Sequence, residues 1–191
     1  MTQYHYASLR TSTSIRLLSF DLSSPSIGNC LSIQLEEFNL SENDQYQALS
    51  YTWGDTNETV PIRIGTRTLR ITSNLHNFLR RLQGRLENAS GGFNAFRFWA
   101  DQICINQKDI PERNSQVALM ADIYRRSQRT LVWLGEAADG SGHAMDLLLR
   151  IDKLHFNRET SLNSILPSAV TIVEEYFASE GGMVSASYIS S

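Results

Sequence analysis

The strongest constraint on the fold is a strand–helix–strand pattern in the second half of the chain. Residues 96–100, FRFWA, predict a short strand. Residues 130–134, TLVWL, are almost continuously apolar, which is typical of a strand buried on both faces. Between them, residues 110–128 predict a helix. Two strands joined by a crossover helix favour a parallel sheet with helices on its faces.

The predicted helix over residues 110–128 has a defined start and an expected buried face. Asp109 and Glu112 have the spacing of a capping box, and Pro111 is tolerated in a first helical turn. We expect the helix to bury an apolar stripe made of Val117, Met120, Ile123 and Tyr124. Arg126 falls on the opposite face, so we expect it to be exposed.

Strand and helix patterns alternate in the rest of the chain. Strands are predicted over residues 14–22, 31–38, 46–55, 62–64 and 69–71, of which the last two form a small hairpin. Helical patterns occupy residues 74–86, 144–154 and 165–177. The residues after the last of these have the small polar composition of a mobile tail, where we expect no function. The order of elements predicts a single α/β domain with a mainly parallel central sheet.

Composition excludes several classes of function. The 191 residues are 41% hydrophobic and 19% charged, as in one ordinary globular domain. The net charge of −3 argues against binding to nucleic acid. We find no signal peptide and no run approaching the roughly 18 apolar residues of a membrane span, so we expect a cytoplasmic protein with reduced thiols at Cys30 and Cys104. The four histidines form no cluster with these cysteines, so no metal site is expected.

The polar segment ADQICINQKDIPER, residues 100–113, is the main candidate site. It is longer and richer in polar groups than a connection between a strand and a helix requires. In parallel sheets, functional groups gather at the carboxyl ends of strands, and Asp55, Asp101 and Glu136 all follow predicted strands. We therefore predict one shallow polar pocket lined by Trp53, Asp55, Asp101, Asn106, Gln107, Glu112 and Arg113.

Each of these residues also has a structural explanation. Trp53 has the size of a core aromatic, and Asp101 is suited to bonding loop amides. Asn106 and Gln107 are able to clasp the loop backbone. Glu112 is suited to capping the helix, with Arg113 as its ion-pair partner. Cys104 lies between two isoleucines, which favours a buried, unreactive thiol.

Three blocks of the sequence resemble the fungal heterokaryon-incompatibility domain, or HET domain. They are YQALSYTWGD, then LRITSNLHNFLRRL, then the long block FWADQICINQKDIPERNSQVALMADIYRRSQRTLVWLGEA. The resemblance covers about residues 15–155, so we assign residues 1–156 to the domain and residues 157–191 to an extension. It implies a role in non-self recognition, in which the domain triggers programmed cell death through self-association or a death-signalling partner.

A weaker resemblance to TIR domains implies an alternative mechanism. The order of a strand ending in Asp101, a polar loop, a helix and an apolar strand is similar to that of TIR domains. This resemblance implies a TIR-like or flavodoxin-like fold in which the hairpin of residues 62–71 is an insertion. Many TIR domains cleave NAD, which implies NAD as the candidate substrate, no established cofactor, and Asp101, Glu112 and Asp146 as candidate catalytic carboxylates. Asp146 stands where TIR enzymes carry a glutamate. That difference favours the association hypothesis over the NAD glycohydrolase hypothesis.

Overall fold

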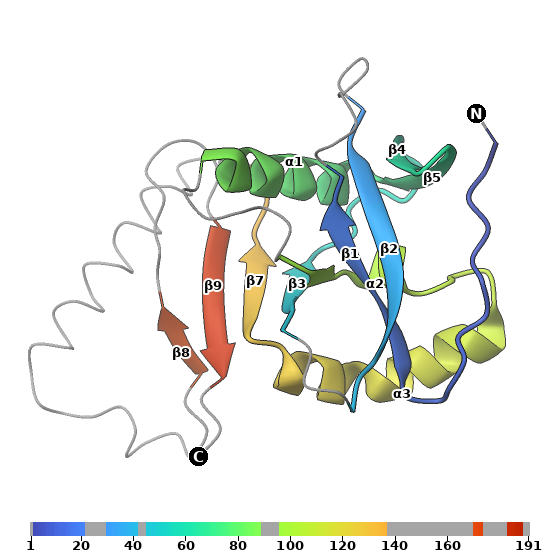
Figure 1. The fold of residues 1–191 in the computed structure, drawn as a ribbon. Helices are drawn as coiled ribbons and strands as arrows, with labels where there is room; N and C mark the ends of the chain where they lie inside the picture. Colours follow the sequence, from blue (N-terminus) through green and yellow to red (C-terminus); the bar gives the residue numbers. More distant parts are fainter. Residues whose placement is uncertain are drawn as a thin grey trace, which may run out of the picture.

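The computed structural model describes residues 2–21, 30–41, 45–88, 96–136, 170–173 and 183–188. The strands are β1 (Ser14–Phe20), β2 (Ser32–Asn39), β3 (Gln47–Tyr51), β4 (Thr59–Ile64), β5 (Arg67–Thr72), β6 (Phe98–Trp99), β7 (Arg129–Trp133), β8 (Val170–Val173) and β9 (Met183–Tyr188). The helices are α1 (Ser73–Asn88), α2 (Asp101–Cys104) and α3 (Ile110–Arg126). In the described part of the chain these strands form one sheet in the order β5-β4-β2-β1-β6-β3-β7-β9-β8 (Figure 1).

The sheet is mixed, so the prediction of a mainly parallel, TIR-like or flavodoxin-like α/β fold flanked by helices is wrong. Among the described strands, five neighbouring pairs are antiparallel and three are parallel. More of the described residues lie in strands than in helices. The sequence pattern identified most strands but not their neighbours. In particular, β1 pairs antiparallel with both β2 and β6, and this pairing interrupts the parallel order.

The parallel part of the sheet is confined to β6, β3 and β7, with one further parallel pair between β2 and β4. The chain leaves β6, passes through α2 and α3, and returns in β7 on the far side of β3. This is the strand–helix–strand unit that the sequence predicted. Because β6, β3 and β7 are parallel, their carboxyl ends lie at one edge of the sheet.

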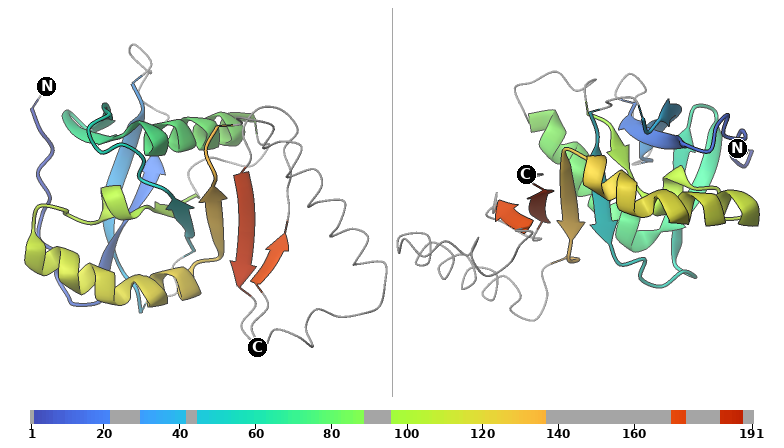
Figure 2. Two further views of the ribbon diagram at one scale, coloured as in Figure 1. Left: turned by 180° about the vertical axis from the view of Figure 1, so that it is seen from behind. Right: turned by 90° about the horizontal axis from the view of Figure 1, so that it is seen from below.

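The two long helices contact opposite faces of the sheet. On β3, Tyr51 packs against Phe78 of α1, with ring centroids 6.3 Å apart. On β6, Trp99 packs edge-on against Tyr124 of α3 at 5.6 Å. Trp99 pairs with Ala48 across the sheet, and side chains alternate along a strand, so Trp99 and Tyr51 lie on opposite faces. The two helices also lie near opposite ends of the strands: in Figure 1 and in the left view of Figure 2, α1 is near the top and α3 near the bottom.

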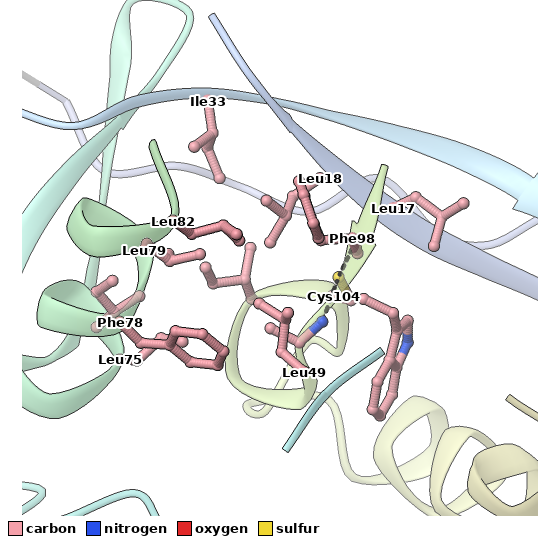
Figure 3. Close-up of a cluster of buried hydrophobic side chains, with 14 of the residues drawn as sticks. Leu17, Leu18, Ile33, Leu49, Leu75, Phe78, Leu79, Leu82, Phe98 and Cys104 are labelled. Carbon is pink, nitrogen blue, oxygen red and sulfur yellow. Dashed lines mark hydrogen bonds between the residues drawn. The ribbon is translucent and has the colours of Figure 1, made fainter. Parts of the chain in front are cut away.

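The core lies mainly between α1 and the sheet. The predicted helical pattern of residues 74–86 is confirmed: α1 buries Leu75, Phe78, Leu79 and Leu82 against Leu18, Ile33, Leu49 and Phe98 (Figure 3). Phe78 also stacks on Trp133 of β7, with centroids 5.4 Å apart. The predicted hairpin is present as β4 and β5, and Gly65 in its turn has a φ of +59°.

The expected buried face of α3 needs a correction. Val117 is 54% exposed, whereas Gln116 and Ile123 are buried, and Met120 and Tyr124 are only partly buried. The inner face of the helix carries buried polar as well as apolar side chains. Gln116, for example, donates to the carbonyl oxygen of Ser14 at 2.8 Å. A search for apolar spacing cannot recognise such a face.

The secondary structure predicted for the C-terminal residues is wrong where the structure describes the chain. Residues 170–173, inside the predicted helix of residues 165–177, form β8, and residues 183–188 of the predicted tail form β9. The segment VTIV is rich in β-branched residues, which favour strands. β9 pairs with β7 and therefore extends the sheet. The predicted helix over residues 144–154 lies outside the described residues.

Candidate functional site

Asp101 fixes an exposed turn at the carboxyl end of β3. The turn, residues 52–55, follows Tyr51, and Gly54 there has a φ of +71°, a conformation that favours glycine. The Tyr51 hydroxyl donates to Oδ1 of Asp101 at 2.7 Å, and the Trp53 indole donates to Oδ2 at 2.8 Å. The backbone N–H of Gln102 donates to Oδ1 at 2.8 Å. Both carboxylate oxygens of Asp101 are thus occupied.

Asn74, the second residue of α1, holds the same turn from another side. Its amide nitrogen donates to the Thr52 carbonyl oxygen at 2.6 Å, and its amide oxygen accepts from the Trp133 indole at 2.8 Å. A Cβ placed on Gly54 would lie 3.4 Å from Cβ of Asn74, which is van der Waals contact, so the positive φ and not a lack of space is what favours glycine there. We call Tyr51, Trp53, Asn74, Asp101 and Trp133 the Trp53 cluster.

The Trp53 cluster joins all three sequence blocks that carry the family resemblance. Tyr51 and Trp53 come from the first block, Asn74 from the second, and Asp101 and Trp133 from the third. Our sequence analysis selected Trp53 and Asp101 but missed the other three. All three lie in the blocks that carry the resemblance, and this was the available signal. It was clearest for Asn74, a polar residue at the start of a helix with no obvious role in the core.

Two tyrosine hydroxyls near Asp101 have raised pKa values. Burial and the adjacent Asp101 carboxylate raise the pKa of Tyr51 far above its usual range. Burial, followed by the charge of Asp101, raises the pKa of Tyr124 to about 12. Both hydroxyls therefore stay protonated, and Tyr51 remains a hydrogen-bond donor to Asp101. Each side-chain donor of the Trp53 cluster has an assigned acceptor.

Three further residues of the polar segment, Gln102, Asn106 and Gln107, make hydrogen bonds close to Asp101 in the sequence. The side-chain oxygen of Gln102 accepts from the backbone N–H of Thr72 at 2.9 Å and from its hydroxyl at 3.2 Å. The amide nitrogen of Gln107 donates to the Asp101 carbonyl oxygen at 2.9 Å. Asn106 accepts a longer bond, 3.3 Å, from the N–H of Lys108. Asn106 and Gln107 therefore clasp the loop that joins α2 to α3.

Glu112 belongs to a second polar group, built around Arg16 of β1. Its two oxygens accept from the two terminal nitrogens of Arg16 at 2.6 and 2.9 Å. Oε1 also accepts from the backbone N–H of Asn106 at 2.8 Å. Asp109 caps α3 as predicted, because its Oδ1 accepts from the N–H of Glu112 at 3.0 Å. The ion-pair partner of Glu112 is thus Arg16 and not Arg113, which is exposed.

The structure does not gather all the predicted site residues into one group. Trp53, Asp101 and Gln107 lie together, while Asn106 and Glu112 lie together with Arg16. Asp55 is exposed and accepts both bonds from Asn57, at 2.8 and 3.0 Å, within its own turn. Asp146 lies outside the described residues.

Cys104 is buried within the hydrophobic cluster (Figure 3). The N–H of Ala100 donates to its sulfur at 3.4 Å, and burial raises the pKa of the thiol to about 12. A neutral, enclosed thiol is a poor nucleophile. The described residues contain no group of three or more His, Cys, Asp or Glu side chains able to hold a metal ion. In the same part of the chain, no helix has the length and apolar character needed to cross a membrane.

An open groove of about 510 Å³ runs along the outer side of α1. Its lining includes His76, Arg80, Arg81 and Glu136. Arg81 donates to Glu136, which follows β7, at 2.7 Å. Burial and the neighbouring Arg80 lower the pKa of His76. The groove shares none of the predicted pocket residues, although Glu136 was correctly expected at a strand end.

Comparisons with known proteins agree with the resemblance. The family model "Heterokaryon incompatibility protein (HET)" matches residues 46–180. Over 120 residues the chain is 39% identical to "Heterokaryon incompatibility protein 6, OR allele" of Neurospora crassa, an alignment that covers 59% of this chain and 17% of that protein. No solved structure matches the chain. Because the family model matches more than half of the sequence, this chain belongs to the heterokaryon-incompatibility (HET) family.

Proposed function

We propose that the chain is a module of fungal heterokaryon incompatibility that arrests growth and triggers cell death by associating with copies of itself or with a signalling partner. One observation carries the mechanism. The three blocks typical of the family converge on the Trp53 cluster, and the cluster presents a rigid, partly exposed aromatic residue at the surface. Rigid tryptophans surrounded by polar contacts are typical anchors of protein interfaces.

The hydrogen bonding of the candidate catalytic carboxylates supports association over catalysis. Asp101 accepts bonds from Tyr51, Trp53 and Gln102, so its charge is already engaged. Glu112 is engaged by Arg16 and Asn106. A general acid, a base or a nucleophile must reach a substrate atom at hydrogen-bond distance. Neither carboxylate has an oxygen left without a donor, whereas the indole ring of Trp53 needs no rearrangement to contact a partner.

The test measures growth arrest when variants are expressed in a fungal host. Trp53→Ala and Asp101→Ala are expected to abolish the arrest while circular dichroism shows a retained fold. Arg125→Ala is the matched control, because Arg125 is exposed and bonds only within α3 to Asp122. That control is expected to arrest growth like the parent. Folded Trp53 and Asp101 variants with full activity would contradict the proposal.

A second experiment separates association from the NAD hypothesis. Purified chain is studied by sedimentation over a wide range of concentration, and then incubated with NAD at the highest concentration. We expect concentration-dependent association that Trp53→Ala weakens, and no release of nicotinamide. Release of nicotinamide that Asp101→Ala abolishes would favour the enzyme. High protein concentration is needed because an activity that depends on association would vanish on dilution.

A further inference from the structure

We infer that Arg16 is a positioning residue for the Trp53 cluster, and that Tyr6 and Arg16, the N-terminal residues that hold α2, belong to the functional unit although the family match begins at residue 46. The inference rests on the proposed function for its biological meaning. Its physical content is independent of that function, because it concerns where Asp101 is held. Arg16 lies on β1, and Asp101 lies at the start of α2.

Arg16 is an unusually buried cation with every contact directed at the site segment or the N-terminal segment. Its side chain is 5% exposed. One terminal nitrogen donates to Glu112 and, at 3.1 Å, to the carbonyl oxygen of Cys104, the last residue of α2. The other donates to Glu112 and, at 2.6 Å, to the carbonyl oxygen of Ala7. Burial lowers the pKa of Arg16, but the hydrogen bond and charge of Glu112 outweigh that effect and raise it.

The N-terminal segment, residues 2–10, completes the support. The hydroxyl of Tyr6 donates to the carbonyl oxygen of Ile103 at 2.8 Å, and its ring lies 4.9 Å from the Arg16 guanidinium carbon. Further out, the N–H of Tyr4 donates to Thr68 at 2.7 Å and the N–H of Thr68 donates to Thr2 at 3.0 Å. The segment is thereby attached to the edge strand β5 at one end and to α2 at the other.

These contacts reach the Trp53 cluster through α2. The helix has only four residues, too few to be stable alone, so its orientation depends on what holds its ends. Arg16 and Tyr6 hold the carbonyl oxygens of its last two residues, Cys104 and Ile103. Its first residue, Asp101, carries the carboxylate that bonds Trp53. Releasing the far end of α2 is therefore expected to disturb the hydrogen bond at its near end.

Two-dimensional NMR of the indole N–H groups tests this directly. The three tryptophans report on different surroundings: Trp53 bonds Asp101, Trp133 bonds Asn74, and Trp99 is buried against α3. The Trp53 signal is assigned from its loss in Trp53→Phe. We expect Arg16→Met to shift the Trp53 indole signal and to speed exchange of the Asn106 amide, while the Trp99 and Trp133 signals stay in place. An unchanged Trp53 signal in folded Arg16→Met would overturn the inference.

Two further variants keep the test decisive if Arg16→Met does not fold. Arg16→Lys retains the charge but loses the paired contact with Glu112, and is expected to give a smaller shift of the same Trp53 signal. If Arg16→Lys folds and leaves that signal and the Asn106 exchange unchanged, the inference is wrong. Arg10→Met is the matched control, because Arg10 is an N-terminal arginine paired with Glu37 but 79% exposed. It is expected to change neither signal.

Growth arrest in a fungal host measures whether the positioning by Arg16 matters for function. Arg16→Lys is expected to weaken the arrest and Arg10→Met to leave it intact. If the Trp53 signal shifts but arrest persists, the positioning stands and the proposed role of the Trp53 cluster fails. If the signal does not shift and arrest is lost in Trp53→Ala, the proposed function stands and the positioning inference fails.

Discussion

Asp101 and Glu112 are carboxylates in one polar segment, yet the fold uses them in opposite ways. Asp101 accepts from neutral donors, a phenol and an indole, beside an exposed turn. Glu112 is paired with a guanidinium, and its side chain is 10% exposed. From the sequence both are candidate catalytic carboxylates of one polar segment, Asp101 after a predicted strand and Glu112 in the first turn of a predicted helix. Their difference shows that the role of a carboxylate is set by the donors that distant strands bring to it.

The comparison also predicts different energetic consequences. A buried charge that loses its partner retains its full desolvation penalty. A carboxylate bound by neutral donors near the surface can be rehydrated when those bonds are lost. The Glu112 pair should therefore be far more sensitive to the loss of one partner than the Asp101 network, and the following variants test that order.

The largest effect is expected from Arg16→Met. It leaves Glu112 buried without its cationic partner, which is expected to cost about 3–5 kcal/mol of unfolding free energy. The combined variant Arg16→Met, Glu112→Met removes both charges and should recover part of that loss. Urea denaturation of the three proteins measures the coupling. A cost below about 1 kcal/mol for Arg16→Met would show that Glu112 is better hydrated than its burial indicates.

A smaller loss is expected from Asp101→Asn, about 1–3 kcal/mol. The amide keeps one oxygen as an acceptor but presents an N–H group at the other position, so either the Trp53 indole or the Gln102 backbone N–H loses its acceptor. Asp55→Asn serves as the control, because Asp55 is exposed and its bonds stay within its own turn. Its expected cost is under about 0.5 kcal/mol. Equal costs for the two variants would contradict the assignment of a structural network to Asp101.

Alkaline pH tests the burial of Cys104, which lies between Asp101 and Glu112 in the sequence. Burial raises the pKa of Cys104 from 9.0 to about 12, so the folded chain keeps a proton that the unfolded chain releases. Stability from this group is complete below about pH 9 and decreases as pH rises towards 12, by about 1.4 kcal/mol at pH 10. Tyr51 is shifted in the same direction. Thermal melts of Cys104→Ala between pH 8 and 10.5 (~2.5 pH units) should show a flatter decline than the parent.

Asp109→Ala tests the capping of α3 next to Glu112. The Asp109 side chain accepts one of the free N–H groups at the helix start, and its loss should cost about 1 kcal/mol. Asp109→Ser retains the cap and is expected to cost less. Because Glu112 is held mainly by Arg16, neither variant should move the Trp53 indole signal. Such a movement would mean that the two polar groups are coupled through the start of α3.

The smallest effect is expected from Arg125→Ala, under about 0.5 kcal/mol. Arg125 pairs with Asp122 on the exposed side of α3. Exposed pairs of this kind are screened by water and salt. The same denaturation experiment provides the baseline against which Arg16→Met is judged, since both variants remove an arginine from an ion pair and only the burial differs.

Several elements could be predicted because their signals are local. The apolar spacing of α1 and the cap at Asp109 depend on neighbours a few residues away, and both are confirmed. The inner face of α3 could not be predicted in full, since it includes the buried Gln116, whose acceptor, the carbonyl oxygen of Ser14, lies on β1. The same limit applies to Glu112, whose obvious local partner was Arg113 and whose actual partner is Arg16.

The sequence by itself determined the family, most of the strand and helix segments, and the choice of residues 100–113 as the segment of interest. Only the tertiary structure decided which strands are neighbours and which donors meet each carboxylate. The physical reason is that periodicity and capping are encoded over a few residues, whereas Leu18 of β1 pairs with Phe98 of β6, 80 residues away, and Arg16 bonds Glu112, 96 residues away. Such pairings depend on the sum of all contacts in the folded sheet, and no short pattern in the sequence records them.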